Sequence, residues 1–198
     1  MFAFRSSLGL ALAAVLGGAV SLRAQTPATP APAKAAPAEV SPAPEVGVAA
    51  PDFTAPAADA NGPLMKPVSL ASLKGKVVVL AFYPGDRTSG CTAELSKFRD
   101  EYATLFGKGV VVLPISVDGI DSHASWAKDM KFPFALVSDP DQSLGKMYGS
   151  AIPGRKMNSR TVFVIGKDGT IRFRNTKFGA LNEDAYKELA AEVAKAKG

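Results

Sequence analysis

Residues 77–83 read VVVLAFY, and residues 84–91 read PGDRTSGC immediately after them. Seven consecutive apolar residues predict a central strand that other elements cover on both faces. After Cys91, apolar side chains recur at helical spacing, at Leu95, Phe98, Tyr102, Leu105 and Phe106. This spacing predicts a helix whose inward face includes Cys91 and which ends near Gly107. A cysteine therefore begins the helix that follows a buried strand.

Further elements extend from this unit towards the C-terminus. The pattern predicts strands over 110–117, 134–137, 161–165 and 170–173, and helices over 122–130, 139–147 and 182–195. Pro114 argues for a bulge or an edge position in its strand. Asp121 or Ser122 is expected to cap the second helix, and Asn182 the last. Strand-helix alternation followed by a hairpin predicts an α/β fold, with a central mixed sheet flanked by helices.

The N-terminus has the layout of a secretory signal peptide over residues 1–24. Arg5 gives the positive region, residues 8–20 carry no charge, and Ala24 precedes Gln25. A membrane span needs roughly 20 apolar residues, so cleavage is favoured over retention as an anchor. We therefore expect a periplasmic or secreted protein with no stable membrane association after cleavage.

Residues 25–47 are rich in proline and alanine and are expected to form a disordered linker before a domain over 48–198. The chain has 23 basic and 18 acidic residues, a net charge of +5. Without Arg5 and Arg23 the balance is 21 − 18 = +3. Such a small excess, with no basic and aromatic stripe, argues against nucleic-acid binding.

Cys91 is the only cysteine, and exported proteins usually pair their cysteines or lack them. Its thiolate would be favoured by the free N–H groups and positive dipole at the start of a helix. A free thiol is only about 3% ionised at pH 7, so full ionisation gains about thirtyfold. A fast enzyme would therefore also need donors that stabilise the developing charge.

Three other interpretations compete for these residues. Cys91 could simply be a small buried residue. His123, the only histidine, could form a Cys-His hydrolase dyad, although a solvated position at a helix start is favoured. The acidic residues could suggest a cation site, but they fall at predicted strand ends and helix caps, a common structural use: Asp118, Asp121, Asp139 and Asp141. One cysteine and one histidine are too few for a zinc or copper centre, so we expect no metal and no cofactor.

The segment Pro84-x-x-x-Thr88-x-x-Cys91 resembles the active-site motif of peroxiredoxins, thiol-dependent peroxidases of thioredoxin-like fold. Several other segments are similar to the Q-type, bacterioferritin-comigratory branch: residues 50–53 (APDF), 92–94 (TAE), 116–118 (SVD), 122–123 (SH), 138–140 (SDP) and 160–163 (RTVF). The resemblance runs from about residue 48 to the end of the chain.

This resemblance implies a role for each matching position. Cys91 would be the peroxidatic nucleophile, and Thr88 would hydrogen-bond the thiolate or the peroxide. Arg160 would polarise the peroxide and stabilise the thiolate, with Arg87, Arg155 and Arg172 as the other arginines to consider. Pro84 would shield the pocket, and Glu94 would hold the arginine. Each has a structural alternative: a helix cap, a turn, a dipole partner or a surface charge.

The implied chemistry converts the thiolate to a sulfenic acid, which an external thiol must reduce. Many Q-type relatives carry a resolving cysteine five residues after the nucleophile, where this chain has Ser96; it also has Ser89 where relatives often have proline. We therefore expect a one-cysteine cycle with a hydroperoxide substrate, a thioredoxin-like or other thiol reductant, and a monomer or weak dimer. The alternative is a peroxide sensor or thiol-disulfide exchange partner without fast turnover.

Overall fold

The computed structural model describes residues 40–198, so the predicted signal peptide and most of the predicted linker lie outside the described residues. The strands are β1 (Thr54–Ala55), β2 (Ala57–Asp59), β3 (Gly62–Pro63), β4 (Val68–Ser69), β5 (Val77–Phe82), β6 (Val110–Ser116), β7 (Leu136–Ser138), β8 (Thr161–Ile165) and β9 (Ile171–Asn175). The helices are η1 (Ala71–Leu73, a 3₁₀ turn), α1 (Ser89–Asp100), α2 (Tyr102–Leu105), α3 (Ile120–Met130), α4 (Ser143–Met147) and α5 (Glu183–Lys197). Among the described helices, none is long and apolar enough to cross a membrane.

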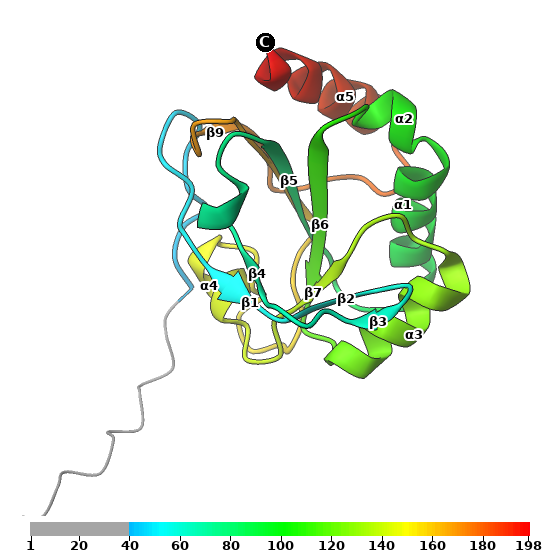
Figure 1. The fold of residues 1–198 in the computed structure, drawn as a ribbon. Coiled ribbons are helices and arrows are strands. Elements are labelled where there is room, and N and C mark those ends of the chain that lie inside the picture. The colour runs from blue at the N-terminus through cyan, green and yellow to red at the C-terminus, as the bar shows by residue number, and fades with distance from the viewer. Residues whose placement is uncertain (1–39) are drawn as a thin grey trace, which may run out of the picture. The chain divides into compact units, whose positions relative to one another are not determined.

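Seven strands form one mixed sheet in the order β3-β2-β7-β6-β5-β8-β9, and β1 pairs separately with β4 (Figure 1). Strands β5, β6 and β7 run parallel to one another, whereas β8 pairs antiparallel with β5 and with β9. Helices lie on both faces of the sheet. The predicted α/β, thioredoxin-like architecture with a mixed central sheet is confirmed.

Strand β5 is buried along its whole length because it supplies two cores. Its side chains alternate between the faces of the sheet, as the period of a strand requires. Val77, Val79 and Ala81 join the cluster that α1, α2, α3 and α5 cover, whereas Val78 and Leu80 join the cluster under α4. The continuous apolar run is therefore explained by burial on both sides.

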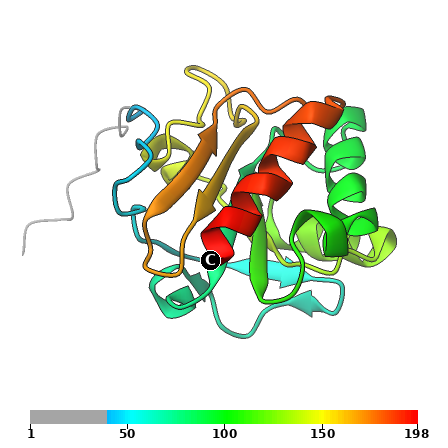
Figure 2. The same ribbon diagram turned by 90° about the horizontal axis from the view of Figure 1, so that it is seen from above.

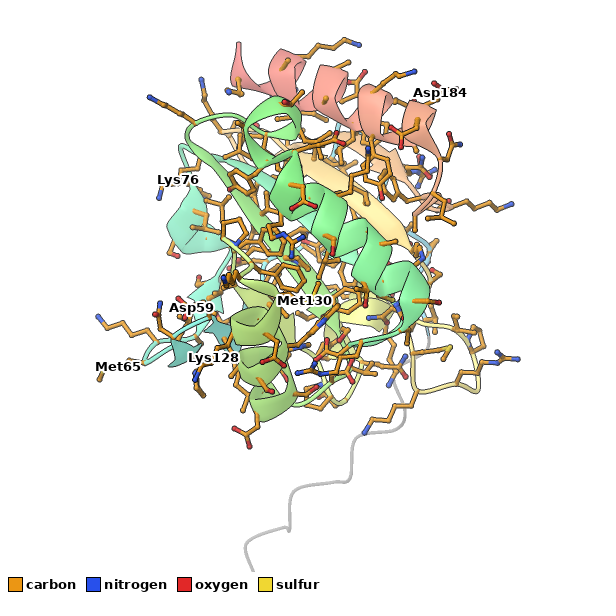
Figure 3. The ribbon with its side chains drawn as sticks, turned by 90° about the vertical axis from the view of Figure 1, so that its right-hand side faces the viewer. Asp59, Met65, Lys76, Lys128, Met130 and Asp184 are labelled. Atoms are coloured by element: carbon orange, nitrogen blue, oxygen red, sulfur yellow. The ribbon has the colours of Figure 1, made fainter. Side chains whose placement is uncertain are left out.

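The helices of the first cluster lie side by side on one face of the sheet (Figure 3). Helix α1 turns Cys91, Leu95 and Phe98 inward, as the spacing predicts. It ends at Asp100 rather than near Gly107, and the rest of the predicted apolar stripe begins on the separate short helix α2. Asn182 precedes helix α5, and its side chain accepts a hydrogen bond from the Asp184 backbone, so the predicted cap is confirmed. Figure 2 shows α5 packed beside the β8–β9 hairpin.

Pro114 differs from its prediction because its strand is interior and has no bulge there. It lies in regular register with Ala81 of β5, while β7 begins to pair only at Ile115. The Ile115 carbonyl faces β5, where it accepts from the Tyr83 backbone, so the backbone nitrogen of Pro114 faces the β7 side. No residue of β7 pairs with Pro114, so its lack of a backbone N–H removes no hydrogen bond from the sheet.

Two further predictions are adjusted by the structure. Helix α3 begins after Gly119 with no side-chain cap, so neither Asp121 nor Ser122 caps it. The last described residues of the predicted linker lie against the domain: the Ser41 backbone donates to Lys146 and the Gly47 backbone to Ile171. Arg174 of β9 also bonds the Ala43 carbonyl.

Candidate active site

Cys91 is the third residue of α1, and its position follows from β5 and the loop after it. Strand β5 ends at Phe82, residues 83–88 form a loop, and Thr88 is the N-cap residue of the helix. The thiol is 0% exposed and is not part of a disulfide. Its position in the first turn places it near the positive end of the helix dipole, which favours a thiolate.

Arg160 reaches the sulfur from a segment far away in the sequence. Its Nη2 donates to Cys91 Sγ at 3.3 Å, and its Nη1 donates to a Glu94 carboxylate oxygen. The sheet explains this meeting, because Thr161 of β8 lies in antiparallel register with Phe82 of β5. The residue before β8 therefore lies beside the end of β5, where the cysteine loop begins.

Gly90 leaves the space through which this guanidinium passes. A Cβ atom at position 90 would lie 2.7 Å from Arg160 Nη2, closer than carbon and nitrogen can approach without displacement. Sequence reasoning assigned no role to Gly90. A glycine inside the first turn of a helix, directly before a nucleophile, is the signal that could have indicated one.

Glu94 is fully buried one turn after Cys91, and its Oε1 has no hydrogen-bond partner among the described residues. Burial raises the pKa of Glu94 to about 7, even though the charge of Arg160 acts in the opposite direction. Burial alone would lower the pKa of Arg160, but the charges of Glu94 and Cys91 outweigh it and raise that pKa. The Arg160 guanidinium, which is 20% exposed, thus contacts both the thiol of Cys91 and the buried carboxyl group of Glu94.

Thr88 and Pro84 lie in the loop before the nucleophile, as predicted. The Thr88 hydroxyl donates to the Gly85 carbonyl at 3.2 Å, and no bond from it to Cys91 is present within residues 40–198. Its lone pairs stay available to a hydrogen-bond donor. The catalytic roles of Thr88 and Pro84 stay predictions, as do those of Cys91, Arg160 and Glu94.

Of the other arginines considered, Arg87 and Arg172 have partners elsewhere. Arg87 bonds Asp129 on α3, and Arg172 bonds Asp168 in the β8–β9 turn. The structure thus brings together Cys91, Arg160 and Glu94.

The prediction that His123 is solvated is wrong. Its side chain is fully buried, with Nδ1 at 3.0 Å from Asp86 Oδ2 and Nε2 at 3.2 Å from the Val137 carbonyl oxygen. Both ring nitrogens are therefore engaged away from Cys91, which leaves no support for a Cys-His dyad. The sequence did not indicate the Asp86–His123 contact, because 37 residues separate the two.

The acidic residues at strand ends serve structure, as predicted for Asp139 and Asp141. The Asp139 carboxylate accepts from the backbone N–H groups of Leu144 and Gly145, and Asp141 accepts from that of Ser143. Asp118 accepts from the Asp86 backbone. In the part of the chain that the structure describes, no cluster of three or more metal-binding side chains is found.

Solved structures define the class of protein. The chain superposes on the crystal structure of peroxidoxin BcpB from Mycobacterium tuberculosis with a TM-score of 0.64 and 27% identity, over 76% of this chain and 96% of that one. It also superposes on the reduced 2-Cys peroxiredoxin of Plasmodium vivax with a TM-score of 0.66 and 25% identity, over 77% and 99% of the two chains. The fold is thus that of the peroxiredoxins, which are thiol-dependent peroxidases.

Sequence comparisons narrow the class. The AhpC/TSA family model matches residues 46–174, and the chain belongs to that family. It is 41% identical over 133 residues to a bcp-like peroxiredoxin of Coxiella burnetii, covering 64% of this chain and 85% of that protein. It is 42% identical over 132 residues to the chloroplastic peroxiredoxin Q of Arabidopsis thaliana, and covers 56% of that longer protein. These relatives place the chain in the Q-type branch.

Proposed function

We propose that this chain is an exported peroxidase that reduces hydrogen peroxide and organic hydroperoxides through Cys91 alone. The observation that supports this most is the 3.3 Å contact between Arg160 Nη2 and Cys91 Sγ. A guanidinium beside the sulfur stabilises the thiolate and can also stabilise the negative charge that develops on a peroxide oxygen.

In the first step the thiolate attacks one oxygen of the hydroperoxide. A sulfur–oxygen bond forms, the oxygen–oxygen bond breaks, and the departing alkoxide or hydroxide takes a proton and leaves as alcohol or water. Sulfur loses two electrons and becomes a sulfenic acid. The helix N-terminus and Arg160 favour the reacting anion, and burial keeps the thiolate in a site of low dielectric.

In the second step an external thiol attacks the sulfenic sulfur, releasing water and forming a mixed disulfide. A second external thiol then releases Cys91 and leaves as part of a new disulfide. Cys91 is the only cysteine of the chain, so no internal disulfide can replace this step. Because the sulfur is 0% exposed, a protein thiol reaches it only after the loop or the first turn of α1 moves aside.

The test treats the full-length chain with one equivalent of hydrogen peroxide and follows its intact mass. We expect rapid gain of one oxygen, reversal by a dithiol, and no gain in Cys91→Ser. Repeated turnover with excess thiol supports the enzyme, whereas one oxidation without turnover supports the sensor. No oxygen gained within minutes contradicts both.

Export is proposed from the first 24 residues alone, to the periplasm or to the exterior. The N-terminal sequence of the protein recovered from the periplasmic fraction and the culture medium tests it. A start near Gln25 in either fraction is expected, and an intact N-terminus in the membrane fraction contradicts cleavage.

A further inference from the structure

His123 is a buried titratable group that the proposed peroxide chemistry does not use. It lies on α3, and both of its ring nitrogens face hydrogen-bond acceptors. Nδ1 lies 3.1 and 3.0 Å from the two oxygens of Asp86, and Nε2 lies 3.2 Å from the Val137 carbonyl oxygen. A carbonyl oxygen only accepts, and an ionised carboxylate only accepts, so both contacts can be hydrogen bonds only when each ring nitrogen carries a proton.

Asp86 stays ionised in this environment. Burial alone would raise the pKa of its carboxyl group, but hydrogen bonds and the charge of His123 outweigh it and hold that pKa below its usual value. Tyr83 and Ser122 each donate a hydroxyl hydrogen to Asp86 at 2.7 Å. The side chains of His123 and Asp86 are 0% and 3% exposed, so the contact between them is buried.

The contact between His123 and Asp86 connects α3 to the loop over residues 83–88, which precedes the helix that carries Cys91. Asp86 lies between Pro84 and Thr88, five residues before Cys91. Its backbone N–H also donates to Asp118 at 2.9 Å, which fixes the loop to the end of β6. Arg87, the next residue, has φ of +60°, a left-handed conformation that costs a non-glycine residue about 1–2 kcal/mol. Such a backbone persists only where its surroundings enforce it.

We propose that protonated His123 is a positioning residue for the peroxidase: through Asp86 it holds the loop that places Thr88, Gly90 and Cys91. The inference rests on the proposed function, since the rate of peroxide reduction is what the positioning serves. When the ring loses a proton, only one acceptor keeps its donor, and a lone pair then faces the other. The loop should therefore be held firmly at low pH and less firmly once the ring is neutral.

Other charged groups surround His123 on the neighbouring elements, but Asp86 is the one that bonds the ring. The titratable side chains on or beside the elements packed against α3 are Tyr83, Asp118, Asp139 and Asp59, with Asp121, Lys128 and Asp129 on α3 itself. A second, exposed ion pair joins the same loop and helix, between Arg87 and Asp129 at 2.6 Å. Exposed pairs contribute little, which makes Asp129 a suitable control position.

The test uses the full-length chain, which has one histidine and therefore one imidazole signal. Nitrogen-15 NMR measures the fraction of the ring that carries both protons as a function of pH. Stopped-flow measurements give the rate of Cys91 oxidation for the wild type and His123→Gln over the same pH range. Their ratio cancels the ionisation of the thiol itself.

We expect the ratio to exceed tenfold where the ring carries both protons and to approach one as the NMR signal shows its loss. Asp86→Asn should lower the rate as much as His123→Gln, and the double variant should lose no more, because the two residues act as one unit. Asp129→Asn should stay within twofold of the wild type.

Two results would overturn the inference. One is a ratio near one while the ring carries both protons, and the other is a ratio that stays constant while the NMR signal shows the loss of a ring proton. If His123→Gln does not fold, the rate of Cys91 oxidation in the wild type must still change with pH in parallel with the NMR titration of the His123 ring. A rate that does not follow this titration also contradicts the proposal. A wild type that does not react with peroxide at all contradicts the proposed function instead.

Discussion

At the scale of single residues, the site depends on Gly90, which has no side chain and therefore leaves room for the Arg160 guanidinium. Gly90→Ala should leave the fold intact, because alanine is favoured over glycine in a helix by about 1 kcal/mol. The new methyl group would lie 2.7 Å from Arg160 Nη2 and push the guanidinium away from the sulfur. Losing one preorganised donor of this kind costs about 100-fold in rate. Stopped-flow oxidation of Cys91 measures the rate, and thermal unfolding measures the fold.

Gly119→Ala is the matched control, since a Cβ at Gly119 meets nothing within 4 Å. It should change the rate of peroxide reduction by less than twofold. A Gly90→Ala variant that reacts as fast as the wild type would show that the contact between Arg160 and the sulfur does not assist the reaction.

Sequence reasoning reached part of this site and missed the rest for a physical reason. Cys91 and its helix follow from local spacing. Arg160 lies 69 residues away, and its choice over three other arginines came from a family resemblance rather than from spacing. Only the pairing of β8 with β5 brings it to the sulfur. His123 was placed in solvent because a helix start is usually exposed, and its burial depends on Asp86, which a non-local contact supplies.

At the scale of elements, helix α1 separates the nucleophile from the position of the family's resolving cysteine. Ser96 follows Cys91 by five residues within the same helix, so their Cα atoms lie about 8.7 Å apart in ideal helical geometry. A disulfide needs Cα atoms within about 7 Å. Ser96→Cys should therefore form an internal disulfide after peroxide treatment only as part of α1 unwinds. Intact mass should show loss of two hydrogens, with a parallel loss of far-ultraviolet circular dichroism.

Thr104→Cys serves as the control, because it adds an exposed thiol on α2 rather than on α1. It should retain the sulfenic oxygen and the full helical signal. A Ser96→Cys disulfide that forms with no change in circular dichroism would show that α1 already permits the bridge without unwinding.

The elements that sequence predicted correctly are those with strong internal periodicity. The apolar residues of β5, the helical spacing of apolar residues in α1 and the capping Asn182 before α5 are each visible within a short stretch of sequence. The structure placed α3 two residues earlier than expected, since its first turn is fixed by neighbours rather than by a capping side chain. The pair β1 and β4 was not predicted at all. Two-residue strands are too short for alternation to be visible, and only tertiary pairing defines them.

At the scale of the whole molecule, buried acids link stability to pH. Glu94 has its pKa raised by burial to about 7, above the ordinary value of 4.5. A group of this kind contributes its full stability below about pH 4.5, where it is protonated in both states. The folded state loses that advantage as pH rises through about 7. Asp86 acts in the opposite direction, because its lowered pKa gives stability that is lost as pH falls.

Comparing Glu94→Gln with the wild type isolates the first contribution, because every other group is shared. The free energy of unfolding of the wild type, relative to Glu94→Gln, should fall by about 2.5 kcal/mol between pH 5 and pH 8, at 1.36 kcal/mol per pKa unit. Denaturant unfolding at a series of pH values measures it, with the exposed Glu188→Gln as control. A difference that rises with pH would show that Arg160 keeps Glu94 ionised throughout. The Arg160 guanidinium would then lie beside a permanent anion at every pH tested.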